Sequence, residues 1–256
     1  MDILLTNDDG FSSRGFYPLL KELSKYFSVT AVAPATEQSW IGKSISRAGG
    51  LSLSKIKLNE FKVFSLNGTP ADCVQVGLYD VINEKPKLVV SGINHGLNTG
   101  HGRILSSGTI GASMEASIDG VKSIASSIHI PEDVKISEVD PIIFQNAAKI
   151  TADIIKIFIN QPFGENIDLI NINIPFNVSL DAEIVVTKPH RDAYGKLFHK
   201  NKGKYNHISP PIDFTTAKPG TDLRALAEGK ISITPISLEL VSKKAMKQMK
   251  KLLENK

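Results

Sequence analysis

Short apolar runs alternate with amphipathic segments along the first 180 residues of the chain. The mainly apolar runs of strand length are residues 2–6, 28–33, 87–91 and 168–172, and residues 123–128, which are half serine, are also interpreted as a strand. Apolar side chains recur at helical spacing in residues 15–26, 70–81, 109–119 and 140–159. A strand that is apolar at nearly every position is typical of a parallel sheet covered on both faces. The alternation therefore predicts a doubly wound α/β fold with a mainly parallel sheet.

The pattern changes after about residue 180, where we expect the core to end. Strands are expected at residues 182–187 and 230–235, and a terminal helix at about 238–253. Residues 189–220 hold prolines and glycines among polar and aromatic residues, which predicts a projecting β-hairpin. Elements that project without a core of their own are natural subunit contacts, so we expect an oligomer. Because no linker is visible, we interpret residues 1–256 as a single domain.

The composition is that of an ordinary globular protein. Of the 256 residues, 41% are hydrophobic and 22% are charged, which is enough for a substantial core. The chain has no run of about 18 apolar residues, and its first residues lack the basic region and cleavage site of a signal peptide. We therefore expect a cytoplasmic protein that does not bind a membrane. The single cysteine, Cys73, rules out an internal disulfide and a cysteine-based zinc site.

The net charge of +4 comes mainly from two lysine-rich segments. They are Lys196, Lys200, Lys202 and Lys204 in the expected hairpin, and Lys243, Lys244, Lys247, Lys250 and Lys251 in the terminal helix. A basic helix binds nucleic acid or an anionic membrane in some proteins, but it is more often a solvated face. We favour the solvated face and expect no specific nucleic-acid partner.

Two adjacent aspartates, Asp8 and Asp9, follow the first apolar run and precede Gly10. In an open α/β sheet, ligands bind beyond the carboxyl ends of the strands, where these side chains would lie. Two neighbouring carboxylates repel each other unless a positive charge lies between them, which favours a divalent cation. The alternative is that one aspartate caps the following helix, a role that Ser12 or Ser13 would also fit.

Further polar residues follow other strands at the same edge. The long polar loop of residues 35–50 contains Ser39, and a glycine-rich run after residue 91 contains Asn94 and Asn98. Loops of this length without regular structure are usually functional. Carboxylate, hydroxyl and amide oxygens are hard ligands, which suit Mg²⁺ or Mn²⁺ better than zinc or copper. Such a site leaves room for water and substrate oxygens around the cation.

The segment Ser107-Gly108-Thr109 opens a predicted helix. Backbone N–H groups and the positive end of a helix dipole bind phosphate at such positions without any basic side chain. Gly108 allows a ligand to approach the backbone closely, and the two hydroxyl groups are additional donors. An ordinary Ser or Thr N-cap is an equally good interpretation of this motif alone.

Other kinds of chemistry are poorly supported. The chain has no Walker A lysine motif, no complete Gly-x-Gly-x-x-Gly fingerprint and no Gly-x-Ser-x-Gly elbow. None of the six histidines has the i, i+4 spacing of a helical zinc site. His95 and His101 lie in the glycine-rich run, within reach of a substrate, and we favour a bystander role for both. A single loop aromatic such as Trp40 packs against protein more often than it stacks on a nucleobase.

Taken together, the motifs resemble the SurE family, the survival-protein-type 5'/3'-nucleotidases. The matching segments, in the family's order, are Ile3-Leu4-Leu5-Thr6-Asn7-Asp8-Asp9-Gly10, Ala33-Pro34 with Gln38-Ser39, Gly68-Thr69-Pro70-Ala71-Asp72-Cys73-Val74, Leu88-Val89-Val90-Ser91-Gly92-Ile93-Asn94-His95-Gly96, Ser107-Gly108-Thr109, and Thr221-Asp222 with Ser232-Ile233-Thr234-Pro235. Each segment is weak alone, but the set is highly specific. One departure is Trp40, because the family usually has glycine after the Gln-Ser pair, and the change is expected to alter the mouth of the pocket.

The resemblance implies a metal-dependent, acid-phosphatase-like phosphomonoesterase. The implied substrates are nucleoside 5'-monophosphates, with 3'-monophosphates and short polyphosphate as further candidates. By position, the ligands of one divalent cation (Mg²⁺ or Mn²⁺) are Asp8, Asp9, Ser39 and Asn94. The phosphate-binding residues are Asn98, Ser107, Gly108 and Thr109. The implied fold is Rossmann-like, with a projecting hairpin and a C-terminal helix exchanged between subunits of a homodimer or homotetramer.

In the expected mechanism, water displaces the nucleoside in line, while the cation and the helix N-terminus at Gly108 neutralise the phosphate. Asp8 or Asp9 is the candidate general base, and an aspartyl-phosphate intermediate is the alternative. A haloacid-dehalogenase-type phosphatase is a rival interpretation, but that chemistry needs Asp-x-Asp, and here the carboxylates are adjacent. The non-enzymatic rival is a nucleotide- or RNA-binding module that uses the basic tail, which predicts salt-dependent binding and no phosphate release.

Overall fold

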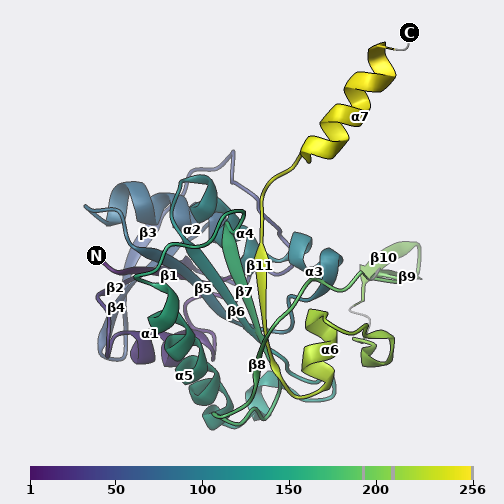
Figure 1. Cartoon of the computed structure of the whole chain (residues 1–256). Coiled ribbons are helices and arrows are strands. Elements are labelled where there is room, and N and C mark those ends of the chain that lie inside the picture. Colours follow the sequence, from purple (N-terminus) through teal and green to yellow (C-terminus); the bar gives the residue numbers. More distant parts are fainter. Residues whose placement is uncertain (192–193, 209–210, 255–256) are drawn as a thin grey trace.

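The computed structural model describes residues 1–191, 194–208 and 211–254. Its core is a nine-stranded sheet in the order β3-β4-β2-β1-β5-β6-β7-β11-β8, flanked by helices (Figure 1). The strands of this sheet are β1 (Ile3–Thr6), β2 (Val29–Pro34), β3 (Leu53–Leu58), β4 (Phe61–Leu66), β5 (Leu88–His95), β6 (Ser123–Ile128), β7 (Leu169–Ile174), β8 (Ile184–Val186) and β11 (Ile231–Ile236). The helices are α1 (Phe16–Leu23), α2 (Pro70–Val76), α3 (Gly100–Ser106), α4 (Gly108–Ile118), α5 (Pro141–Phe158), α6 (Asp222–Ala227) and α7 (Lys243–Glu254).

The sheet is parallel from β4 through β2, β1, β5 and β6 to β7. Only β3 on β4 and β11 on β7 pair antiparallel within the described sheet. The doubly wound, mainly parallel α/β fold is therefore confirmed. Its parallel strands end at one edge, so the loops after β1, β2, β5 and β6 lie close together.

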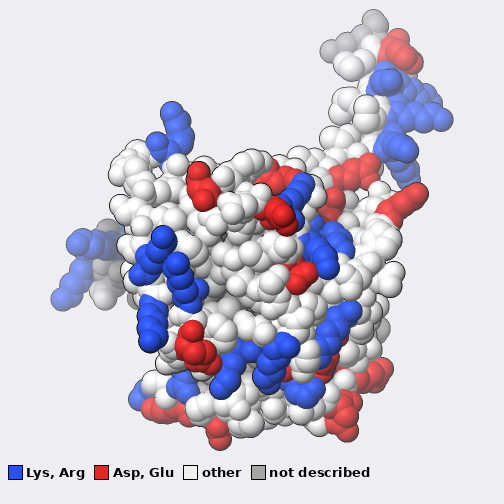
Figure 2. Space-filling view, turned by 90° about the vertical axis from the view of Figure 1, so that its left-hand side faces the viewer, with Lys and Arg blue, Asp and Glu red and all other residues white. Residues whose placement is uncertain are grey.

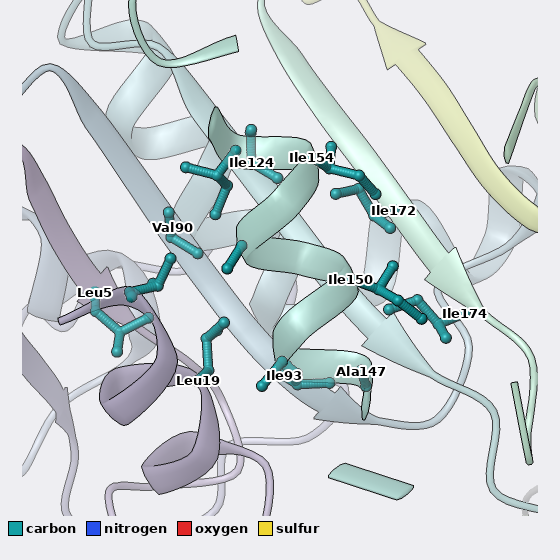
Figure 3. Packing of buried hydrophobic residues seen from close by; sticks show 14 of the residues in the cluster. Leu5, Leu19, Val90, Ile93, Ile124, Ala147, Ile150, Ile154, Ile172 and Ile174 are labelled. Atoms are coloured by element: carbon teal, nitrogen blue, oxygen red, sulfur yellow. The ribbon is translucent and has the colours of Figure 1, made fainter. Parts of the chain in front are cut away.

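Helices α1 and α5 cover one face of the sheet and bury an apolar interior against it (Figure 3). Leu19 of α1 and Ile150 and Ile154 of α5 lie over Leu5 and Ile172 of the strands (Figure 3). Helices α2 and α4 pack on each other and bury a second apolar cluster with the strands. Helix α5 has a strong apolar stripe that faces the sheet. Its start is fixed by the N-cap Asp140, which accepts a hydrogen bond from the Ile142 N–H at 2.9 Å.

The glycine-rich run and the C-terminal region differ from the expectation. Strand β5 continues to His95, because β6 still pairs with it after a register shift between Ser91 and Asn94. Helix α3 occupies residues that the glycines marked as loop. The sheet also continues beyond residue 180, where the core was expected to end, because β8 and β11 add to it and α6 packs beside β11.

Within residues 189–220, β9 (Phe198–Asn201) and β10 (Lys204–His207) form a two-stranded hairpin whose residues are all exposed. Helix α7 projects away from the body of the molecule, and none of its described residues is buried (Figure 1). Basic side chains lie along this projecting helix (Figure 2). None of the described helices has the length and apolar character needed to cross a membrane.

Candidate active site

Asp8 and Asp9 lie directly beyond the end of β1, between the ends of β2 and β5. Asp8 is 4% exposed, and its Oδ1 accepts a hydrogen bond from the hydroxyl of Thr109 at 2.6 Å. The Oδ2 of Asp9 accepts the backbone N–H of His95 at 3.0 Å. Gly10 follows with φ of +89°, a conformation that favours glycine, and turns the chain away. The two carboxylates are thus fixed from α4 and from β5, two elements far apart in sequence.

The alternative that one of these aspartates caps the following helix is wrong. Helix α1 begins at Phe16, its N-cap is Gly15, and no side chain caps it. Ser13 does not cap it either, because its hydroxyl accepts a hydrogen bond from Asn7 Nδ2 at 2.9 Å. The carboxylates are therefore available for another role.

Burial and mutual repulsion disfavour the charged forms of this pair. Burial raises the pKa of Asp8 to about 6, although hydrogen bonds from Thr109 partly oppose the change. Burial, followed by the charge of Asp8, raises the pKa of Asp9 well above its ordinary value. Among the described residues, no lysine or arginine pairs with either carboxylate. Two neighbouring carboxylates that are largely removed from water, and that no lysine or arginine of the described residues neutralises, fit the binding of a cation.

His95 does not supply that positive charge. Its Nδ1 lies 3.8 Å from Asp9 Oδ2, but burial, reinforced by Arg14, lowers the pKa of the imidazole to about 4. Its Nε2 accepts the backbone N–H of Gly15 at 3.1 Å. His95 is therefore a neutral residue that joins β5 to the start of α1. It also lines the cavity described below, so its bystander role stays a prediction. His101 is similarly occupied, with Nδ1 3.0 Å from the carbonyl of His190.

Asn94 and Ser39 add neutral oxygens near the carboxylates. Asn94 is 9% exposed and donates from Nδ2 to the carbonyl of Gly96 at 2.8 Å, which leaves Oδ1 as the atom suited to a cation. Ser39 is exposed and donates its hydroxyl to Glu37 at 2.5 Å. The Gln38 N–H donates to the carbonyl of Asp8 at 2.7 Å and holds this loop against β1. No cluster of three or more His, Cys, Asp or Glu suited to a metal occurs in the described chain, so neutral oxygens would complete the ligand set.

Helix α4 presents its N-terminus to the same place. Ser107 is its N-cap and accepts the Ile110 N–H at 3.1 Å, so the capping interpretation of this serine is confirmed. A Cβ added to Gly108 would lie 2.8 Å from the Cβ of Asp8, a separation that real Cβ atoms do not adopt. Thr109 is fully buried and directs its hydroxyl to Asp8. Thr109 therefore orients a carboxylate, whereas Ser107 lines the neighbouring cavity.

Asn98 is held by residues that the sequence analysis did not identify. Its backbone N–H donates to Asn173 Oδ1 at 2.8 Å, and its side-chain Nδ2 donates to Ser127 Oγ at 2.8 Å. Asn171 Nδ2 donates to the Asn98 carbonyl, also at 2.8 Å. All of these partners are fully buried in β6 and β7. In the sequence, the only indication of these partners is that they are polar residues within predicted buried strands.

One cavity of about 290 Å³ brings these groups together. Five of the predicted residues line it, namely Asp8, Ser39, Asn94, Asn98 and Ser107. The other three, Asp9, Gly108 and Thr109, adjoin His95 or Asp8 directly. The cavity is also lined by Arg103, His129, Glu132 and Ile212, which the sequence analysis missed. Arg103 lies on α3, and His129 and Glu132 follow β6, whose carboxyl end reaches the same edge.

The glycine-rich segment is tied to the C-terminal region by Asp222, which is completely buried at the start of α6. Its Oδ2 accepts the Gly100 N–H at 2.8 Å, and its Oδ1 accepts the His190 N–H at 2.8 Å. Asp222 thus fixes the start of α3, which carries Arg103 into the cavity.

The family model, the related proteins and the solved structures that match this chain all indicate the same family and fold. The family model "Survival protein SurE" matches residues 3–196. A protein named 5'-nucleotidase SurE from Archaeoglobus fulgidus is 37% identical over 245 residues, covering 94% of this chain and 93% of its own length. One of the same name from Methanocaldococcus jannaschii is 38% identical, covering 95% and 94%.

Among solved structures, the crystal structure of a SurE protein from Aquifex aeolicus superposes with a TM-score of 0.82 at 34% identity. The match covers 99% of this chain and all of that one, so it extends through the C-terminal elements. The family match, the relatives and the fold agree with the order of motifs along the sequence. The chain belongs to the SurE family.

Proposed function

We propose that this chain is a metal-dependent phosphomonoesterase that hydrolyses nucleoside 5'-monophosphates to nucleoside and phosphate. The observation that carries the proposal is the pair of neighbouring carboxylates, Asp8, which is buried, and Asp9, whose side chain is 11% exposed, beside a cavity that Ser107 at the N-terminus of α4 also lines. A nucleotide substrate is supported by relatives that are named 5'-nucleotidase and match nearly the whole chain.

The proposed ligands of one divalent cation, Mg²⁺ or Mn²⁺, are Asp8, Asp9, Ser39 and Asn94. Their oxygen atoms are hard donors, which these ions prefer, and the uncompensated carboxylates supply the charge that holds the ion. The Ser39 hydroxyl donates its hydrogen to Glu37, which leaves the lone pairs of its oxygen for the cation. When bound, the ion supplies positive charge and Lewis acidity at the phosphoryl group.

The protein's own groups bind and orient the phosphate. The N-terminus of α4 and the Ser107 hydroxyl lie where backbone N–H groups and the helix dipole stabilise an anion. Asn98 offers an amide that is held rigidly by β6 and β7. Thr109 orients Asp8, and Asp8 or Asp9 accepts the proton of the attacking water as general base.

The test is phosphate release from 5'-AMP by the purified protein with Mn²⁺ or Mg²⁺, and again in EDTA. We expect activity with the metal, its loss in chelator, and its recovery when the metal is restored. Full activity in chelator would contradict the metal requirement. Trapping of a phosphoenzyme would replace the general-base role by an aspartyl-phosphate.

Hydrolysis of 3'-monophosphates and of short polyphosphate, and a cytoplasmic location, remain predictions. The first two are checked in the same assay by replacing 5'-AMP with 3'-AMP or tripolyphosphate.

We further propose that the chain is a homodimer or homotetramer in which α7 is exchanged between subunits. In the described chain, α7 contributes no buried residue, yet Met246, Met249, Leu252 and Leu253 are more than half exposed on it. An amphipathic helix gains stability by burying such a stripe, and a second copy provides a surface for it. Light scattering of the full chain and of a chain ending at Leu238 tests this, because the truncated chain should be smaller than the loss of mass alone explains.

A further inference from the structure

Trp40 lies at the open side of the candidate active site. It lines the same cavity as Asp8, Asn94 and Ser107, and it is 40% exposed. A buried tryptophan would be part of the core, and a fully exposed one would have no fixed place. This partly exposed position leaves some of the indole ring available to a bound molecule.

The loop that carries Trp40 is fixed on both sides of this residue. The Gln38 N–H donates to the carbonyl of Asp8 at 2.7 Å, and the Gly42 N–H donates to the carbonyl of Ser106 at 2.9 Å. Trp40 is therefore held between the end of β1 and the junction of α3 with α4. Its distance from the catalytic carboxylates is set by the backbone.

Two rings support the indole from outside. The Tyr194 ring centre lies 5.4 Å from that of Trp40, and the His207 ring centre lies 4.8 Å away, nearly edge-to-face. Tyr194 is itself anchored, because its hydroxyl donates to the Gly102 carbonyl and lies 2.7 Å from Ser106 Oγ. The exposed hairpin thus contacts Trp40 through His207. Trp40, Tyr194 and His207 form one aromatic cluster.

The backbone of Trp40 has φ of +61°, in the left-handed region where a bulky residue is rare. Such a conformation is unfavourable for a residue with a side chain, whereas glycine adopts it readily. A strained residue beside an active site motivates a functional hypothesis. A bulky aromatic residue at a position that suits glycine indicates a functional role for the ring itself.

We propose that Trp40 is a specificity-determining residue on which the nucleobase stacks while the phosphate lies at Asp8 and α4. This inference rests on the proposed function and names the part of the substrate that the mouth of the site recognises. The cavity is small, about 290 Å³, so a nucleotide with its phosphate at the carboxylates extends its base toward the exposed indole. Stacking accepts any base, because every base has a flat π-face, so the specificity conferred by Trp40 is for nucleotides over sugar phosphates that lack a base.

The first test is tryptophan fluorescence, because Trp40 is the single tryptophan of the chain. Adenosine, which has no phosphate to hydrolyse, should quench the emission saturably, whereas ribose should not. An absence of quenching by adenosine at any concentration up to its solubility would overturn the inference.

The second test compares 5'-AMP with ribose 5-phosphate in Trp40→Gly, Trp40→Phe and the unaltered protein. We expect Trp40→Gly to raise KM for 5'-AMP about 10-fold with little change in kcat, and to leave KM for ribose 5-phosphate unchanged. Trp40→Phe should restore most of the affinity for 5'-AMP. Tyr205→Ala is the matched control, because Tyr205 is an exposed aromatic of the same hairpin that does not line the cavity.

The outcomes separate the inference from the proposed function. Quenching by adenosine without phosphate release from 5'-AMP would support the role of Trp40 and contradict the nucleotidase activity. Phosphate release with an unchanged KM in Trp40→Gly would support the activity and overturn the role of Trp40. An equal rise of KM for both substrates would also overturn it, because that result indicates a structural role.

Discussion

The interior beneath α1 and α5 and the carboxyl edge of the same sheet are both buried, but they are built from opposite kinds of residue. Beneath the helices, apolar side chains such as Leu5, Ile150 and Ile172 fill the space (Figure 3). At the carboxyl edge, Asp8 is as well buried as many core residues, yet it carries a carboxylate beside that of Asp9. The two regions lie on the same strands and differ by only a few positions in sequence.

This difference separates the residues that stabilise the fold from those that form the candidate active site. Apolar burial stabilises a fold by roughly 25 cal/mol per Å² removed from water. A buried pair of carboxylates without a counter-charge destabilises the metal-free protein, as the raised pKa values of Asp8 and Asp9 indicate. Residues that weaken the fold at one edge are expected where a protein performs chemistry. The predictions below test this contrast.

The largest effect is expected from Asp8→Asn and Asp9→Asn. Each removes a charge from the proposed metal site and a candidate general base, so phosphate release from 5'-AMP should fall by at least about 10³-fold. Circular dichroism should show that both variants are folded. A variant that retains more than a tenth of the activity would remove that aspartate from the mechanism.

In the apolar interior, Ile172→Ala should have the opposite result. Ile172 is completely buried beneath α5, so the cavity left by the substitution should lower the free energy of unfolding by about 2–5 kcal/mol. Denaturant unfolding measures the loss. Specific activity of the folded fraction should be nearly unchanged, and a large loss of activity at unchanged stability would break the contrast between the two regions.

The pH dependence of stability in chelator should report on Asp8. Its pKa is about 6 in the folded protein against 3.8 in the reference state, so the folded state binds the proton more tightly. Stability should therefore fall as the pH rises from about 4 to about 6, by an amount on the order of 2 kcal/mol, and stay low above it. Asp8→Asn should show a smaller fall. The same pH dependence in both proteins would contradict the raised pKa of Asp8.

The smallest effect is expected at a positioning residue, Asn173. Its amide holds the backbone N–H of Asn98 at 2.8 Å and the Asn98 carbonyl at 3.2 Å. Asn173→Ala should lower kcat/KM for 5'-AMP about 10-fold through the lost placement of Asn98. Thr151→Val is the matched control, because Thr151 is equally buried but hydrogen-bonds only to Ser126 among its described contacts. Equal losses in both variants would indicate a general effect on the fold.

Local patterns in the sequence were sufficient to predict the strands of the parallel core. Short, mainly apolar segments placed β1 and β7 within one or two residues, because buried parallel strands have that pattern, and the segment 123–128 placed β6 although three of its six residues are serine. Because ligands bind beyond the carboxyl ends of parallel strands, the sequence also predicts Asp8, Asn94 and Ser107 at one edge, and all three line one cavity.

Features that depend on long-range contacts were not predictable in this way. Helix α6 is six residues long and too short for a periodic signal, and α3 begins at Gly100 in a run with several glycines. The addition of β8 to β11 depends on pairing between distant segments. The left-handed backbone at Trp40 and the buried partners of Asn98 become visible only when the elements are assembled.

The central measurement is the thermal unfolding of the unaltered protein and of the Asp8→Asn, Asp9→Asn double variant, each in EDTA and in excess Mn²⁺. At about 100 times the dissociation constant, Mn²⁺ should raise the melting temperature of the unaltered protein by roughly 5 °C or more. The double variant should not respond to Mn²⁺, and in EDTA it should melt above the unaltered protein. Equal responses of the two proteins to Mn²⁺ would show that Asp8 and Asp9 do not hold the cation.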